Sequence, residues 1–286
     1  MRVAVTGASG RLGRALVREL APLGEIQAWS RPDYDLDDPA AAARVIASRP
    51  ELIVHSAAWT EVDACAREPG LAERRNAAAV WELARAAAAV DIRLVLVSTN
   101  EVFSGAEQGE PYRPTDAVAP KNAYGASKLQ GEKSAQDAYV GWAEGLLIVR
   151  TAWLYGPPGN DFPTKIIGAA ARAIQTAAPL RLVYDETGSP SLTDDVARGV
   201  RALIEGHASG VRHVVNSGRA TRAEWAAFVL ASAGVTVATE LVPAATWKRD
   251  STPPAWGVLE SDVTLRPWQD ATREYVESEI LTRTGG

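Results

Sequence analysis

Tyr124 and Lys128 stand four residues apart in the segment Lys121-Asn-Ala-Tyr-Gly-Ala-Ser-Lys128, and both side chains can take part in proton chemistry. If the segment is helical, this spacing puts the phenol and the ammonium on one face. A neighbouring positive charge favours the phenolate, so we expect Lys128 to lower the pKa of Tyr124. Such a pair suits proton transfer to or from an oxygen that changes between alcohol and carbonyl. The same spacing also occurs on surface helices with a solvated lysine, so the elements around the pair must decide.

Thr99 is a third candidate for this chemistry. It follows a buried strand pattern, residues 93–98, and stands 25 residues before Tyr124. Its hydroxyl can hydrogen-bond the same substrate oxygen as the phenol, or it can simply cap the end of the strand. His55 also ends a buried strand pattern, but a single histidine there is more often a packed structural residue. Asn76 fits an internal amide that supports the active-site backbone, and it fits an exposed helix position equally well.

A glycine-rich turn follows the first strand pattern. Residues 3–6 read as a buried strand and residues 12–20 as a helix, with three glycines in a Gly-x-x-Gly-x-x-Gly pattern. Glycine permits positive φ and close backbone approach, and a helix N-terminus offers unpaired N–H groups and the positive end of its dipole to a phosphate. A strand before and a helix after are typical of a dinucleotide site; the alternative is a tight turn that binds nothing. The expected contacts of the cofactor in this loop are Gly7, Ser9, Gly10, Arg11, Leu12 and Gly13.

The end of the second strand indicates which dinucleotide binds. Folds that prefer NAD usually carry Asp or Glu here to hold the ribose hydroxyls, but residues 25–29 run into Ser30 and Arg31. Arg31 and Arg11 could bracket a 2′-phosphate through charge-assisted hydrogen bonds, so NADPH is the expected cofactor. Alternatively, Arg31 faces solvent and Asp33 or Asp35 binds the ribose. Further expected cofactor contacts are Asp35 and Leu36 beside the adenine, and Ala57 and Ala58, whose small side chains let the cofactor lie against the backbone.

Composition excludes several classes of protein. A net charge of −5 without a basic run argues against nucleic-acid binding. The single cysteine, Cys65, excludes an intrachain disulfide framework and a multi-cysteine metal site, and we expect no metal. The chain opens directly on a strand pattern and has no apolar run near 18 residues, so neither a signal peptide nor a membrane span is expected. A cytoplasmic protein is the prediction.

The order of strands and helices predicts an α/β fold. Residues 1–150 read as a Rossmann-type doubly wound parallel sheet that binds the dinucleotide and carries the catalytic residues. Residues 151–286 read as a smaller C-terminal α/β lobe that mainly binds substrate, with some segments returning to the main domain. Besides residues 12–20 and the segment around Tyr124, helices are expected at 39–48, 76–89, 162–173, 193–205, 221–233 and 270–281, and a strand is expected at 180–184.

The motifs together resemble those of the extended short-chain dehydrogenase/reductases, and more narrowly the dTDP-4-dehydrorhamnose reductase group. The resemblance rests on the glycine loop, Ala57-Ala-Trp-Thr-Glu-Val-Asp63, Ser98-Thr-Asn-Glu-Val-Phe-Ser-Gly105, the Tyr124–Lys128 pair and Arg150-Thr-Ala-Trp-Leu-Tyr-Gly156, in that order. It extends to Gly188-Ser-Pro-Ser-Leu-Thr-Asp-Asp195 and Val215-Asn-Ser-Gly218 in the second half.

This resemblance implies a role for each matching residue. Tyr124 would protonate a sugar C4 oxygen while NADPH delivers hydride to C4, Thr99 would hydrogen-bond the same carbonyl, and Lys128 would bind the nicotinamide ribose. Trp153 would pack near the sugar, unless it is a core residue at a strand end. The expected substrate contacts are Asn100, Glu101, Trp153 and Asn160.

Two segments depart from the group's pattern. Relatives commonly have Asp-Tyr where this chain has Asn100-Glu101. A carboxylate buried beside an anionic substrate would be costly, so either Glu101 points away or the sugar differs. Late in the chain, relatives usually carry an Arg-Pro pair before a Ser-x-Leu. The corresponding stretch here is Arg249-Asp-Ser-Thr-Pro-Pro-Ala-Trp-Gly-Val-Leu259, so the arginine has moved or been lost. Lys165, Lys248 and Arg249 are candidates for binding the substrate diphosphate and are equally compatible with solvated charges.

The sequence therefore predicts NADPH-dependent reduction of the 4-keto group of a nucleotide-diphospho-4-keto-6-deoxysugar. One alternative is an epimerase or dehydratase that retains NAD, and Arg31 in place of an acidic residue speaks against it. Another is a non-catalytic NADP-binding regulatory subunit, which the intact Thr99, Tyr124 and Lys128 set disfavours. The expected partner is a nucleotide-diphosphate deoxysugar, and a homodimer remains open.

Overall fold

Six parallel strands form the central sheet of this computed structural model, which describes residues 1–106 and 109–280. They are β1 (Arg2–Thr6), β2 (Glu25–Trp29), β3 (Leu52–His55), β4 (Arg93–Thr99), β5 (Leu146–Thr151) and β10 (Gly210–His213). Their order across the sheet is β10-β5-β4-β3-β1-β2. Every residue of β3 and β5 is buried, as expected where helices cover both faces of a parallel sheet.

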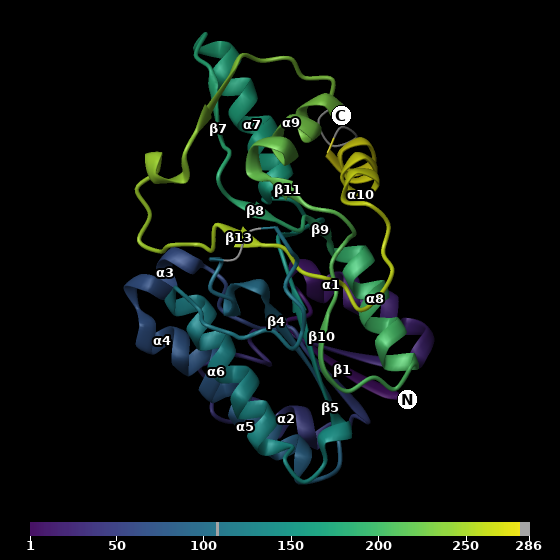
Figure 1. Ribbon diagram of the computed structural model, residues 1–286. Coiled ribbons are helices and arrows are strands. Elements are labelled where there is room, and N and C mark those ends of the chain that lie inside the picture. Colours follow the sequence, from purple (N-terminus) through teal and green to yellow (C-terminus); the bar gives the residue numbers. More distant parts are fainter. Residues whose placement is uncertain (107–108, 281–286) are drawn as a thin grey trace.

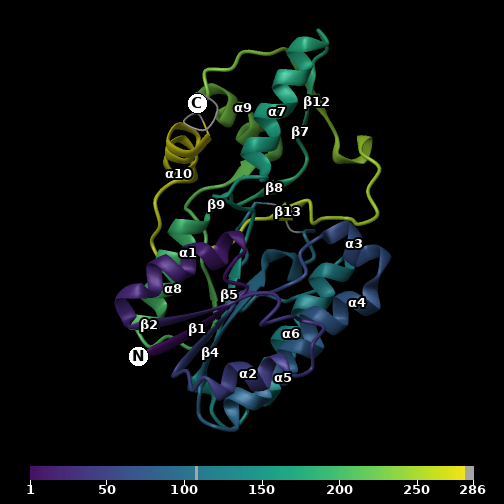
Figure 2. The same cartoon turned by 180° about the vertical axis from the view of Figure 1, so that it is seen from behind.

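Helices pack on both faces, so the predicted doubly wound architecture is confirmed (Figures 1 and 2). Alternate residues of β1 serve the two faces: Val3 and Val5 pack with α1 (Arg11–Leu20) and α8 (Thr193–Glu205), whereas Ala4 packs on the other side. The helices of that other face are α2 (Ala41–Ala47), α5 (Ala79–Ala88) and α6 (Ala123–Ala138), with α3 (Val62–Arg67) and α4 (Pro69–Glu73) near its upper edge in Figure 1.

The strand order reverses around β1, which lies between β2 and β3. In open α/β sheets, ligands bind in the crevice beyond the carboxyl ends of the strands at such a switch point. The glycine loop leaves β1 there, Ser30 and Arg31 leave β2 there, and Ala57 and Ala58 leave β3 there. The topology thus gathers the predicted cofactor residues at one edge of the sheet.

A smaller layer of short sheets and helices lies above this edge (Figure 1). Its helices are α7 (Phe162–Gln175), α9 (Arg222–Ser232) and α10 (Trp268–Tyr275), the last continued by a π-helical turn, Val276–Ile280. Its strands are β6 (Leu154–Tyr155), β7 (Leu180–Val183), β8 (Thr187–Gly188), β9 (Ser191–Leu192), β11 (Ala220–Thr221), β12 (Thr239–Val242) and β13 (Trp256–Gly257). Aromatic side chains dominate its core, among them Tyr155, Trp225, Trp268 and Tyr275. We call this layer the lobe.

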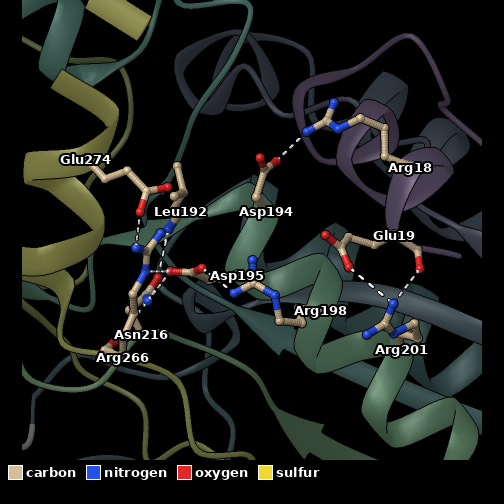
Figure 3. A network of polar contacts seen from close by, with 10 residues as sticks. All are labelled: Arg18, Glu19, Leu192, Asp194, Asp195, Arg198, Arg201, Asn216, Arg266 and Glu274. Atoms are coloured by element: carbon tan, nitrogen blue, oxygen red, sulfur yellow. Dashed lines mark hydrogen bonds and ion pairs between the residues drawn. The ribbon is translucent and has the colours of Figure 1, made fainter. Parts of the chain in front are cut away.

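A polar network ties α8 to its neighbours (Figure 3). The Asp195 side chain is 1% exposed and accepts hydrogen bonds from Asn216 Nδ2 at 2.7 Å and Arg266 Nε at 2.8 Å. Arg266 also pairs with Glu274 on α10, and Arg18 on α1 pairs with Asp194 at 2.6 Å. The segments 188–195 and 215–218, which carried part of the resemblance, therefore meet in a network that joins the sheet layer to the lobe.

Most expected elements are present, with shifted ends. The helix expected at 76–89 is a π-helical turn, Arg74–Ala78, followed by α5. The helix expected at 39–48 is α2, and the last helix begins two residues early at Trp268, while its expected end at residue 281 lies outside the described residues. Within the described part of the chain, no helix is both long and apolar enough to cross a membrane.

Candidate active site

Tyr124 lies in the first turn of α6, where side-chain capping fixes the backbone. The Asn122 side-chain oxygen accepts a hydrogen bond from the Gly125 N–H at 2.8 Å, which satisfies one of the free N–H groups of the helix end. A Cβ on Gly125 would lie 2.1 Å from the Glu101 carbonyl oxygen. Glycine therefore lets α6 approach the turn after β4, and this close approach brings Tyr124 beside Thr99.

The three predicted catalytic residues line one cavity of about 410 Å³, which we call the central cavity. Thr99 comes from the end of β4, Tyr124 and Lys128 come from α6, and all three are buried. The Thr99 side chain lies close enough to the Tyr124 phenol to lower its pKa. Gly7 and Gly10 line the same cavity, so the predicted catalytic set and the glycine loop share one space.

The pKa of Tyr124 is raised, which corrects the expectation that Lys128 lowers it. Burial of the phenol is the largest cause, and the Glu101 carboxylate adds to it, while the Thr99 side chain acts in the opposite direction. The Lys128 ammonium is turned to β4, where Nζ donates to the Val97 carbonyl oxygen at 2.8 Å. The phenol is thus held in its protonated form, which is the form that can donate a proton.

Lys128 is buried, and burial lowers its pKa to about 8. The carboxylate of Glu132, one turn later on α6, partly offsets this effect. Glu132 itself is held by Arg150 through Nε at 3.0 Å and Nη2 at 2.7 Å, and by the Ser98 hydroxyl at 2.5 Å. These buried polar and charged side chains link α6 to β4, at the residue before Thr99, and to β5.

Asn76 and His55 both turn out to be structural residues. The buried Asn76 amide accepts from the Trp59 N–H at 2.8 Å and donates to the Trp59 carbonyl at 2.9 Å, so the internal-amide interpretation is confirmed. His55 is buried with Nδ1 2.7 Å from the Thr6 hydroxyl. Burial, with a smaller contribution from Lys128, lowers the pKa of His55 to about 3, so it is neutral at ordinary pH.

The glycine loop leads from the central cavity into an outer cavity of about 280 Å³. Gly7 has a φ of +70°, which favours glycine, and a Cβ on Gly13 would lie 2.0 Å from the Gly7 carbonyl oxygen. The Ser9 N–H donates to the Ser30 hydroxyl at 2.9 Å, so Ser30 braces the loop. The predicted residues that line the outer cavity include Ser9, Ser30, Arg31, Asp35, Leu36, Ala57 and Ala58.

Arg11 and Asn160 lie differently from the expectation. The Arg11 guanidinium donates to the carbonyl oxygens of Gly156, Gly159 and Asn160 at 3.2, 3.0 and 3.1 Å. Arg11 lines the central cavity and Arg31 the outer one, so the two do not bracket a single phosphate. Asn160 is exposed and lines none of the three cavities described here; what it offers is the carbonyl that receives Arg11.

Asn100 and Glu101 both line the central cavity. Asn100 Nδ2 donates to the Gly257 carbonyl at 3.3 Å, a bond that an ionised aspartate cannot donate. Glu101 does not point away: its Oε2 accepts from Asn122 Nδ2 at 2.6 Å. Burial raises the pKa of Glu101, while the Asn122 hydrogen bond and the Arg222 charge lower it. The carboxylate therefore has protein partners of its own inside the cavity.

Trp153 lines the central cavity, but other side chains pack against its indole. The guanidinium carbon of Arg222 lies 3.6 Å from the ring centroid, and the Trp225 ring is stacked at 5.8 Å. The backbone of Trp153 has a φ of +41°, which is unusual for a bulky residue and occurs at strained functional positions. Only the uncovered part of the ring can face a ligand.

A third cavity, of about 920 Å³, lies in the lobe, and we call it the lobe cavity. Its cationic lining residues are Lys165, Arg172, Arg181, Arg222 and Arg249. Trp247 also lines it and is 46% exposed, whereas the buried Trp256 and Trp268 belong to the core. Two of the three predicted diphosphate candidates, Lys165 and Arg249, thus face this cavity; Lys248 is not among the residues that line it.

Comparison with known proteins assigns the family. The model of the family described as RmlD substrate binding domain matches residues 1–279. The chain belongs to this family. Among its relatives, the spore coat polysaccharide biosynthesis protein SpsK of Bacillus subtilis is 32% identical, covering 96% of this chain and 97% of that protein. The dTDP-4-dehydrorhamnose reductase of Mycolicibacterium smegmatis is 32% identical over 100% of this chain and 88% of that protein.

A solved structure matches the fold closely. The dTDP-4-dehydrorhamnose reductase of Bacillus anthracis, solved in complex with NADP, is 30% identical and superposes with a TM-score of 0.87, covering 96% of this chain and 98% of that one. The predicted resemblance is therefore confirmed along nearly the whole chain.

Two arginines that line the cavities of this RmlD-family chain were not predicted from the sequence. Arg75 lines the outer cavity, with its guanidinium 5.1 Å from the Trp59 ring centroid and bonded to both oxygens of Asp37. Arg222 lines both the central and the lobe cavities. Neither stands in a chemical motif, and only the fold brings them to the cavities.

Proposed function

We propose that this chain reduces the 4-keto group of a nucleotide-diphospho-4-keto-6-deoxysugar with NADPH as the reductant, and dTDP-4-dehydrorhamnose is the first substrate to test. The observation that carries the proposal is that Thr99, Tyr124 and Lys128 are all buried and line one cavity together with Gly7 and Gly10 of the glycine loop. The relative in Mycolicibacterium smegmatis and the NADP-bound structure from Bacillus anthracis, both dTDP-4-dehydrorhamnose reductases, support it.

The residues of the crevice fit a bound NADPH, which supplies the hydride. The start of α1 offers free N–H groups to the pyrophosphate and has no acidic residue in its first turn. Ser30 and Arg31 line the outer cavity at the end of β2, with no acidic side chain in their place, and they would bind the 2′-phosphate. Asp35 and Leu36 would lie beside the adenine, and the cofactor would lie flat against the protein backbone at Ala57 and Ala58.

Tyr124 serves as the proton donor in this proposal. Its raised pKa keeps the phenol protonated, so it can give a proton to the C4 oxygen as negative charge develops there. The Thr99 hydroxyl hydrogen-bonds the same oxygen, and Lys128 binds the nicotinamide ribose and can return a proton to the tyrosine. Exclusion of water from this buried site strengthens each of these interactions.

The substrate would span two cavities. The keto-sugar would lie in the central cavity beside Asn100, Glu101 and Trp153, and the nucleotide in the larger and more cationic lobe cavity. This assignment divides the work of the chain: residues 1–150 bind the dinucleotide and carry out the chemistry, and residues 151–286 mainly bind the substrate. Asn160 is not part of the proposed substrate contacts.

The test is turnover with a labelled cofactor. Purified protein is given dTDP-4-dehydrorhamnose, generated in place, with NADPH deuterated at the transferable position. We expect NADPH consumption and deuterium at C4 of the product sugar, detected by mass spectrometry and NMR. An NAD-retaining epimerase or dehydratase would instead carry tightly bound NAD when purified and consume no NADPH. A regulatory subunit would bind NADPH without consuming it with any keto-sugar in a panel.

A further inference from the structure

Arg222 is the one described residue that lines both the central cavity and the lobe cavity. It is the first residue of α9, and Thr221 caps that helix through a capping box with Glu224. A fixed helix start gives the side chain a defined origin. Any ligand that extends from one cavity into the other must therefore pass this guanidinium.

The contacts of Arg222 hold it in place without consuming its hydrogen-bonding capacity. Its guanidinium carbon lies 3.6 Å from the Trp153 ring centroid and 5.1 Å from that of Phe162. Its Nε lies 3.6 Å from Glu186 Oε2, which is longer than a hydrogen bond. An arginine has five N–H donors in a planar fork, so stacking plus one loose ion pair leaves donors for a ligand.

The charge of Arg222 persists despite its burial. Its side chain is 26% exposed, and burial lowers its pKa to about 10, with Glu186 acting against this. The guanidinium is thus a cation at neutral pH. Arg249 shares the Glu186 carboxylate through a 2.6 Å bond, so it is more firmly paired than Arg222.

We propose that Arg222 binds the diphosphate that links the nucleotide to the keto-sugar, an inference that rests on the proposed function. The two ends of such a substrate would occupy the two cavities, and the part at their junction is the anionic diphosphate. A planar guanidinium matches two phosphate oxygens, and its charge makes those hydrogen bonds strong. Lys165 lines only the lobe cavity, so we assign it to the nucleotide end of the substrate.

Ligand fragments test this assignment. Calorimetry compares dTDP and thymidine binding to the NADPH-loaded wild type and to Arg222→Met. We expect dTDP binding to weaken roughly tenfold or more and thymidine binding to change less than about twofold, because only dTDP carries the phosphates. The matched control is Arg181→Met, which removes a lobe-cavity cation whose side chain is 52% exposed and paired with Glu240; it should weaken dTDP less than about threefold.

Two outcomes overturn the assignment: dTDP and thymidine losing affinity to the same degree, or dTDP binding Arg222→Met as tightly as wild type. If Arg222→Met does not fold, Arg222→Lys keeps the charge without the fork and should show a smaller loss with the same preference for dTDP. A wild type that binds dTDP but reduces no keto-sugar would refute the proposed function, while the comparison of fragments would still decide the role of Arg222.

Discussion

Glu132→Gln should destabilise the protein strongly, because it leaves the Arg150 guanidinium without its counter-charge in the core. The two side chains are 2% and 5% exposed, and Glu132 accepts two hydrogen bonds from Arg150 and one from Ser98. Breaking a buried ion pair by removing one partner costs about 3–5 kcal/mol. At about 2–4 °C per kcal/mol for a chain of this size class, the melting temperature should fall by roughly 6–20 °C.

Thermal and urea unfolding, followed by circular dichroism, measure this loss. Glu240→Gln is the matched control, since its pair with Arg181 has side chains 46% and 52% exposed and should contribute at most about 1 kcal/mol. The double variant Glu132→Gln/Arg150→Met should be clearly more stable than Glu132→Gln alone, because the unpaired Arg150 guanidinium is no longer in the core. A Glu132→Gln protein within about 1 kcal/mol of wild type, or a double variant no better than the single one, would refute the reasoning.

Two further predictions concern the cofactor. Arg31→Ala should weaken NADPH roughly tenfold or more and NADH far less, measured by fluorescence titration, because only NADPH carries the 2′-phosphate; equal losses would remove Arg31 from phosphate recognition. The pKa of Lys128 is lowered to about 8, so its ammonium is lost as pH rises through that value. NADPH affinity should therefore fall above pH 8 in the wild type and be flat in Lys128→Met, and a flat wild-type profile would show that the ammonium does not hold the cofactor.

Residues close together in the chain were the easiest to predict. The Tyr124 and Lys128 pair and the glycine loop each depend on local spacing within one helix or one turn, and the fold keeps that spacing. The parallel sheet followed from alternating strand and helix patterns, so Thr99 could be expected at the edge where Tyr124 lies.

Long-range contacts could not be predicted in this way. Arg11 reaches the Gly156 carbonyl, 145 positions later in the chain, and Arg222 enters the cavities only because α9 packs against Trp153. The direction of the Tyr124 pKa also depends on burial and on Glu101, and neither can be derived from the spacing of Tyr124 and Lys128. Spacing identified the groups, whereas packing determined their orientation and charge.

The most direct test of the account compares wild type with Tyr124→Phe, using NADPH oxidation with dTDP-4-dehydrorhamnose as the assay and NADPH affinity as the control. Loss of a positioned proton donor typically costs about 10²–10⁴-fold in rate. We predict a loss of turnover in that range with NADPH affinity changed less than about twofold, since the phenol is assigned to the substrate oxygen. A Tyr124→Phe protein that turns over at the wild-type rate would contradict the account.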